Sequence, residues 1–224
     1  MTNGFDAISL SISPDSRTLA AAGLASFNFH GITNRLVFWD LTTKQKINKL
    51  AAAARLAVIV SFSHDGRMVA IGYLDGAVRV WDYESEQLLA EFTDQHQRIW
   101  CVAFSPDDAC LVAGGDEGVV VFHDMRAKGS FRPVTASSNW ILGLSFAPDG
   151  KTLASAEGDG TIKLWNVATR EVALVLKGHL GAASYASFSK DGNLLASCGG
   201  GDGTVRLWPA ASFDEIPQQE RSQK

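Results

Sequence analysis

The sequence predicts an all-β fold made of five copies of one structural unit. Three observations support it: an alternating strand that ends in an aromatic residue, a turn signal just before it, and the regular return of both along the chain. In "GDGTVRLWPA", residues 201–210, Asp202-Gly203 is a dipeptide that favours a two-residue hairpin turn. Thr204 to Trp208 then alternate with the period of a strand. The stretch therefore predicts a strand that leaves a hairpin.

The same pattern recurs upstream at a fixed interval. It ends at Trp81 in "LDGAVRVWD" and at Trp165 in "GDGTIKLWN", and weaker copies end at His123 and Trp39. The final positions 39, 81, 123, 165 and 208 lie 42, 42, 42 and 43 residues apart. A constant period of this length indicates a repeat architecture.

A second turn precedes the aromatic strand in every copy. Its versions are "SISPDSR" at 11–17, "SFSHDGR" at 61–67, "AFSPDDA" at 103–109, "SFAPDGK" at 145–151 and "SFSKDGN" at 187–193. Proline presets φ and an Asp side chain closes on its own backbone, so a hairpin is expected there. In the first unit we expect strands near 7–13, 18–22, 35–39 and 45–50, and four corresponding strands in each later unit. Each unit is then a four-stranded antiparallel sheet.

Composition and charge exclude several classes of partner. The net charge is −4, from 20 basic and 24 acidic residues that are mixed along the chain, which disfavours nucleic acid. Cys101, Cys110 and Cys198 are too few and too scattered for a disulfide framework, which favours a reducing compartment. No apolar run approaches the roughly 18 residues that span a bilayer, and the N-terminus lacks a signal-peptide pattern. We expect a cytoplasmic protein without a membrane partner.

The "FSPDG"-type turn, the "LAS"-type strand, the "DGTVRLW" strand and Gly178-His179 together resemble the WD-repeat β-propeller family. The resemblance covers residues 5 to about 208 and implies a β-propeller of five four-stranded blades. The expected blades are about 5–50, 55–93, 97–135, 139–177 and 181–216, followed by a disordered tail at 217–224. The closing "LWPAASFDEI" resembles the ends of WD-repeat segments in large bacterial proteins, some of which carry a serine/threonine kinase domain.

The resemblance also implies a structural network. In the family, a linker histidine, a hydroxyl of the second strand, the hairpin aspartate and the tryptophan form a buried chain of hydrogen bonds. The last repeat has all four: His179, Ser197, Asp202 and Trp208.

The other repeats have only parts of this network. The fourth repeat keeps three of its residues without the histidine, namely Ser155, Asp159 and Trp165. The second repeat keeps Asp75 and Trp81. The third repeat has Glu117 and His123, with His96 as its candidate linker histidine. Because a partial network specifies packing less well, the blades are expected to differ in rigidity.

Catalytic and ligand-binding readings of these residues are weaker than the structural one. A nucleophilic serine needs an exposed turn with oxyanion donors, whereas Ser197 lies within the strand "LLASC". The "GGGDG" run at 199–203 is followed by a strand and not by the helix that a phosphate loop requires. The five histidines show no metal-ligand spacing. We therefore predict no enzymatic activity, no metal and no cofactor.

The expected function is a scaffold that binds other proteins or peptides. Partner contacts are expected where loops enter the first strand of each blade, because aromatic and arginine side chains make the best anchors there. The leading candidates are Arg98, Trp100, Asn139 and Trp140. The alternative for the two tryptophans is packing between adjacent blades. The alternative function is a regulatory or substrate-positioning segment of a bacterial signalling enzyme, such as a serine/threonine kinase.

One loop is longer than its counterparts. From the turn serine to the aromatic position takes 26 residues in the first repeat (Ser13 to Trp39) and 18 in the second to fourth. The insertion, within 23–34, carries Phe27, Phe29 and His30. It is either a recognition finger for a partner or an apolar plug over the ring.

The sequence leaves ring closure open, although an incomplete arc is favoured over a closed ring. An arc would expose apolar faces, among them Ile8, Leu10 and Ile12 in the first blade and Leu194, Val205 and Leu207 in the fifth. Repeat arrays normally carry polar caps at such ends. An uncapped arc is expected to self-associate, to recruit a partner chain that completes the ring, or to aggregate.

Overall fold

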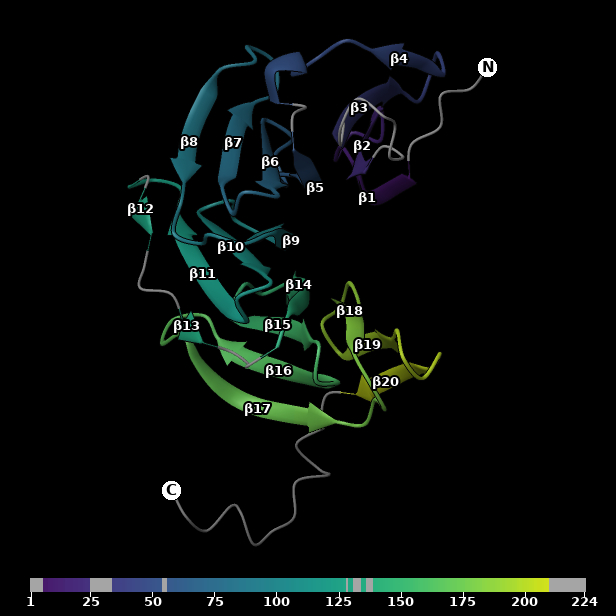
Figure 1. Ribbon diagram of the computed structural model, residues 1–224, viewed down its shortest axis with the longest axis vertical. Helices are drawn as coiled ribbons and strands as arrows, with labels where there is room; N and C mark the ends of the chain where they lie inside the picture. The colour runs from purple at the N-terminus through teal and green to yellow at the C-terminus, as the bar shows by residue number, and fades with distance from the viewer. Residues whose placement is uncertain are drawn as a thin grey trace, which may run out of the picture.

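In the computed structural model of the chain, residues 6–24, 34–53, 56–127, 129–130, 134–135 and 139–209 are described. They form five separate antiparallel sheets arranged around a common centre (Figure 1). The first sheet consists of β1 (Asp6–Ile12), β2 (Thr18–Leu24), β3 (Asn34–Asp40) and β4 (Gln45–Ile47). The second consists of β5 (Ala57–Phe62), β6 (Met68–Tyr73), β7 (Val78–Asp82) and β8 (Leu88–Phe92). The third consists of β9 (Ile99–Phe104), β10 (Cys110–Gly115), β11 (Val119–Asp124), β12 (Gly129–Ser130) and β13 (Val134–Thr135).

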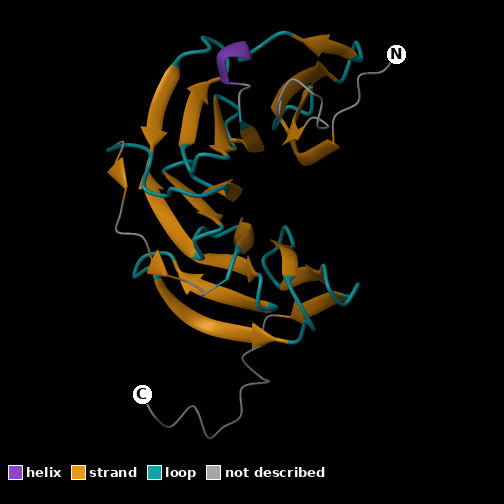
Figure 2. Ribbon diagram, viewed as in Figure 1, coloured by secondary structure: helices purple, strands orange, loops and turns teal. Residues whose placement is uncertain are grey.

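The fourth sheet consists of β14 (Ile141–Phe146), β15 (Thr152–Glu157), β16 (Thr161–Asn166) and β17 (Glu171–Lys177), and the fifth of β18 (Ala183–Phe188), β19 (Leu194–Gly199) and β20 (Val205–Pro209). Figure 2 shows that the described part of the chain is almost entirely strand and loop. Its one helical element is a three-residue 3-10 turn, Ala51–Ala53. The all-β propeller with antiparallel blades is confirmed.

The strand register repeats from blade to blade. In each sheet the aromatic position of the third strand pairs with the second residue of the second strand, as in Leu19↔Trp39, Leu153↔Trp165 and Leu195↔Trp208. The hairpin glycines between these strands have positive φ, for example +87° at Gly160. Glycine adopts this conformation without a steric cost, which is why Asp-Gly marks the turn.

Two blades depart from the expected four strands. In the third, the fourth strand is split, since β12 pairs with one end of β11 and β13 with the other. The sequence between the two pieces includes Pro133, which has no amide hydrogen to donate to a ladder. In the fifth, the described sheet has three strands and ends at Pro209. The predicted boundary at 216 and the tail at 217–224 lie outside the described residues.

The core lies between neighbouring blades. The second strands carry small buried residues, such as Ala20, Ala70 and Ala154, so that adjacent sheets approach closely. Gly72 and Gly114 mark two such close approaches, because a Cβ built at Gly72 would lie 2.6 Å from Cγ2 of Ile99 and one at Gly114 would lie 2.7 Å from Cγ2 of Ile141, each in the next blade. Each junction thereby buries apolar side chains from two consecutive repeats.

The five blades form an open arc. Packing between the innermost strands runs from β1 through β5, β9 and β14 to β18 and does not return to β1, and Figure 1 shows the first and fifth sheets facing each other across an opening. Leu10 on β1 is 65% exposed and Leu207 on β20 is 61% exposed. The structure therefore shows the arc and not the closed ring.

Candidate interaction surface

The innermost strands of all five blades surround a central cavity of about 560 Å³. Its lining combines apolar side chains with serines, including Leu10, Val60, Trp100, Leu142 and Tyr185. These residues come from β1, β5, β9, β14 and β18 in turn, one blade after another. A concave surface of this kind can receive a segment of a partner protein.

Trp100, which lines this cavity, forms a unit with Arg98 just before β9. The Arg98 guanidinium lies 4.6 Å from the centre of the Trp100 ring, a cation–π contact. The edge of the ring is also held, since Trp100 Nε1 donates to Asp116 Oδ1 at 2.5 Å. The backbone carbonyl of Arg98 in turn accepts from the N–H of Asp116 at 3.1 Å. These contacts fix a half-buried indole on β9 before any partner arrives.

Trp140 occupies the position in the fourth blade that Arg98 occupies in the third. Its side chain is 52% exposed, so its ring is not buried between blades as the alternative for this residue required. Asn139 shapes the backbone beside it, because Asn139 Oδ1 accepts from the Trp140 N–H at 2.9 Å. The loop is held close to its neighbour, since a Cβ at Gly158 would lie 2.7 Å from Asn139 Oδ1. The remaining candidates, Phe27, Phe29 and His30, lie outside the described residues, so the choice between finger and plug stays open.

The four network residues of the last repeat are brought together by the fold. Trp208 Nε1 donates to Ser197 Oγ at 2.9 Å, Ser197 Oγ lies 2.8 Å from His179 Nε2, and His179 Nδ1 lies 3.1 Å from Asp202 Oδ2. A carboxylate only accepts, so His179 donates to Asp202 and Ser197 donates to His179. Backbone N–H groups of Thr204 and Leu180 lower the pKa of Asp202, which keeps it ionised. The Ser197 hydroxyl is buried and committed to two partners, which suits a structural role.

The fourth blade has the predicted contact between Ser155 and Trp165, but the network continues through two residues that the sequence analysis missed, and Asp159 bonds to Thr161 instead. Trp165 Nε1 donates to Ser155 Oγ at 2.9 Å, as in the last repeat, but Ser155 then donates to Glu157 Oε1 at 3.0 Å. Glu157 is fully buried and forms an ion pair with Lys163 Nζ at 2.8 Å. Burial raises the pKa of Glu157, and the lysine opposes that shift. The available signal was an acidic residue at the end of the strand "LASAE" with a lysine six residues later.

The prediction that His96 is the linker histidine of the third blade is wrong. The side chain of His96 is exposed, and only its backbone N–H takes part, donating to Glu117 Oε1 at 2.7 Å. Gln95 takes the buried position and is 4% exposed. Gln95 lies 84 residues before His179, which is two periods of 42, so strict counting would have found it.

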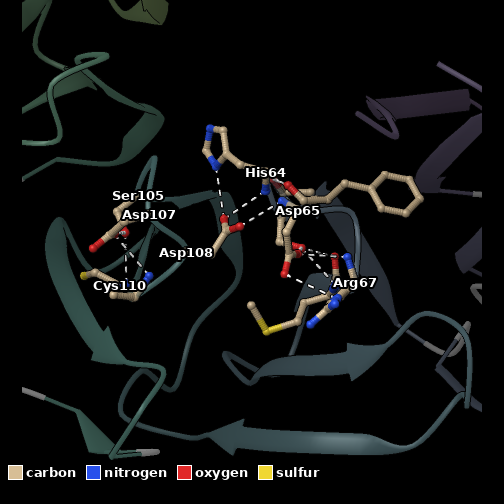
Figure 3. A network of polar contacts seen from close by, with 12 residues as sticks. His64, Asp65, Arg67, Ser105, Asp107, Asp108 and Cys110 are labelled. Carbon is tan, nitrogen blue, oxygen red and sulfur yellow. Dashed lines mark hydrogen bonds and ion pairs between the residues drawn. The ribbon is translucent and has the colours of Figure 1, made fainter. Parts of the chain in front are cut away.

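The opposite face carries the Ser-Pro-Asp-Gly type turns, and one pair of them is joined by side chains (Figure 3). Asp108 accepts from the backbone N–H of His64 at 2.8 Å and from that of Asp65 at 2.9 Å, and it lies 3.0 Å from His64 Nδ1. Asp108 belongs to the third blade and His64 to the second. This contact ties the two blades together at the rim of a second cavity of about 460 Å³, lined by His64 and Lys190 among others.

The described ranges contain no helix that is long and apolar enough to cross a bilayer. The same ranges hold no cluster of three or more His, Cys, Asp or Glu side chains placed to bind a metal ion.

Comparison with known proteins identifies similar sequences and folds. The family model "WD domain, G-beta repeat" matches residues 130–166 and 170–209, and the model of the anaphase-promoting complex subunit 4 WD40 domain matches residues 33–107. No curated protein matches the sequence. A chain in the crystal structure of a mitotic checkpoint complex is similar in fold, with a TM-score of 0.78 and 22% identity over 94% of this chain. This chain spans 66% of that one, just under two thirds of its length.

Proposed function

The chain belongs to the WD-repeat β-propeller family, and from that premise we propose that it is a non-catalytic scaffold whose partner protein or peptide binds around Arg98, Trp100 and Trp140, beside the central cavity that Trp100 lines. Propellers of this family typically serve as platforms for protein interactions, and the similar solved chain is itself part of a multi-protein complex. A cytoplasmic location stays a prediction. The kinase-segment alternative has no support in the family models or in the similar fold.

One observation supports this site above others. Trp140 is 52% exposed. In the neighbouring third blade, the equivalent residue is Arg98, which is held against Trp100 by the cation–π contact. Exposed aromatic rings and arginines that are already ordered lose little entropy on binding, and such residues dominate interface energies. Asp116 and Asn139 supply polar atoms around these anchors, which favours a partner segment with both apolar and polar groups.

The test is affinity capture with the native chain and three variants, followed by affinity measurements on each partner identified. Trp140→Ala and Arg98→Ala are each expected to weaken binding by about 2 kcal/mol, as central anchors do. The matched control is Leu88→Ala, which truncates an apolar residue on the outer strand β8 that is nearly as exposed as Trp140 (45% against 52%) and should leave binding unchanged. Partners that bind both anchor variants as tightly as the native chain would place the site elsewhere.

A further inference from the structure

The junctions between consecutive blades follow a pattern in their turns. At three junctions a proline in the turn of one blade packs on a glycine in the turn of the next. A Cβ at the glycine would lie 3.3 to 3.6 Å from the proline Cδ in the pairs Pro14 with Gly66, Pro106 with Gly150, and Pro148 with Gly192. Proline has no N–H, and glycine has no side chain to accept one. In these three junctions the two turns therefore meet through van der Waals contact between proline and glycine, without a hydrogen bond between these two residues.

The remaining junction replaces both residues together. His64 stands at the proline position and Asp108 at the glycine position, where it has φ of +54°. The backbone N–H of His64 exists because no proline is present, and the Asp108 carboxylate accepts it together with the N–H of Asp65. In this junction, the residue that replaces proline is matched by a carboxylate at the glycine position of the neighbouring turn. Counted from the proline position as the first, the glycine position is the third position of the turn.

The fifth blade has Lys190 at the proline position of its turn. The face of this blade that points away from the fourth blade is exposed. Lys190 carries a backbone N–H, and its side chain adds a positive charge at an exposed position. Behind the turn, Val205 and Leu207 are exposed on β20. Their equivalents in the second blade, Val78 and Val80, are fully buried against the third blade.

The face of the first blade that points away from the second blade is also exposed. Leu10 and Ile12 on β1 are exposed, whereas their equivalents in the third blade, Val102 and Phe104, are buried against the second. Both ends of the arc therefore expose apolar residues at positions that the second and third blades bury. Contiguous exposed apolar surface often marks an interaction site.

We propose that the open face of the fifth blade binds a WD-type blade of a partner protein, and that this partner blade carries an aspartate or glutamate at the third position of its turn, facing Lys190. The carboxylate accepts the N–H groups of Lys190 and Asp191 and pairs with the lysine ammonium. Val205 and Leu207 pack against the first and second strands of the partner blade. This surface is separate from the proposed site around Trp140.

A second copy of the chain fits this face less well. Its own free leading blade has Ser16 at the third turn position, a short neutral side chain in place of the carboxylate. Charge complementarity with Lys190 therefore favours an acidic partner blade over self-association.

The experiment supplies such a blade in the same polypeptide. A chimera of residues 1–208 followed by 82–177 adds a fourth strand to the fifth blade and then two further blades, the first of which brings a second copy of Asp108 next to Lys190. Compared with the native chain, the chimera is expected to be monodisperse, to lose most of its binding of a hydrophobic dye, and to melt several degrees higher. A chimera that fails to fold, or that binds the dye as the native chain does, would overturn the proposal.

The role of charge is tested within the chimera. Lys190→Pro alone and Asp108→Gly in the added copy alone are each expected to lower the melting temperature, and the double variant, which recreates a proline–glycine junction, should restore it. Strictly additive effects of the two changes would contradict the assigned pairing. A native chain that runs as a discrete dimer, and that Leu207→Asp converts to a monomer of 24.0 kDa, would make a second copy the occupant and would also overturn the proposal.

Discussion

At the residue scale, His123 shows how one substitution in a repeat changes the chemistry of a blade. It stands where the other four blades have tryptophan, is 2% exposed, and stacks on Phe92 with ring centres 4.1 Å apart. Burial lowers its pKa from 6.5 to about 4, and the nearby Asp94 carboxylate opposes the shift. Below pH 6.5 the unfolded chain binds a proton at this residue and the folded chain does not, so stability falls as the pH drops towards 4.

His123→Phe is expected to reduce this pH dependence. The phenyl ring keeps the stack on Phe92 and cannot bind a proton, so the slope of unfolding free energy against pH, up to about 1.4 kcal/mol per pH unit for one group, should decrease between pH 6.5 and 4. Urea unfolding at several pH values measures the slope. His96→Phe removes an exposed histidine of the same blade and serves as the control. An unchanged slope in His123→Phe would show that His123 is not the source.

His179 tests the structural reading of the last repeat. His179→Ala leaves the buried Ser197 hydroxyl without its acceptor and is expected to lower the free energy of unfolding by about 1–3 kcal/mol. Partner binding should persist, because the network lies inside a blade. Thermal melting gives the first quantity and the affinity measurement the second. A variant with native stability and lost function would point to a chemical role for His179.

At the scale of the element, the turn between the first and second strands is a small, repeated device. Its leading serine donates to the aspartate two residues on and accepts the N–H five residues on, as Ser63 does with Asp65 at 2.7 Å and Met68 at 2.8 Å. The same contacts recur at Ser13, Ser105 and Ser189. The turn is thus rigid by itself, and the junction residues His64 and Asp108 join two such rigid turns.

We expect His64 and Asp108 to be energetically coupled. His64→Pro removes a donor and Asp108→Gly removes its acceptor, so each alone should destabilise the chain, whereas the double variant recreates the proline–glycine contact of the other junctions. The expected coupling is about 0.5–1 kcal/mol, measured as a double-mutant cycle by urea unfolding. The distant pair His64→Pro with Leu88→Ala should be additive. No coupling in the first cycle would mean that Asp108 does not act on the junction.

At the scale of the whole molecule, the open arc concentrates exposed apolar surface at its two ends. Ile8, Leu10 and Ile12 on β1 and Val205 and Leu207 on β20 are all exposed, whereas the counterparts of Leu10, Ile12, Val205 and Leu207 in the second and third blades are buried. These side chains add little to the stability of the arc itself, because little of their surface is removed from water.

Leu10→Thr combined with Leu207→Thr is therefore expected to reduce binding of a hydrophobic dye while leaving the melting temperature close to that of the native chain. Threonine keeps a β-branched side chain suited to strands. The comparison variant is Leu153→Thr, which places a hydroxyl in a fully buried position of β15 and should lower the melting temperature strongly. A large loss of stability in the double variant would indicate that the two end faces are covered.

The sequence by itself determined the repeat, because the turn dipeptides and the aromatic positions at 42-residue spacing are local signals that survive in every blade. It also determined the four-residue network around Ser197, whose members all match one motif. It did not reveal the ion pair of Glu157 with Lys163 or the pairing of His64 with Asp108, because each depends on which side chains two strands or two blades bring together. The position of Gln95 follows from the 42-residue period, and the choice of His96 was an error of counting. Only the tertiary structure decided that the arc is open, since closure depends on how each sheet rotates against its neighbour, and that angle is set by packing across the junctions and not by any local pattern.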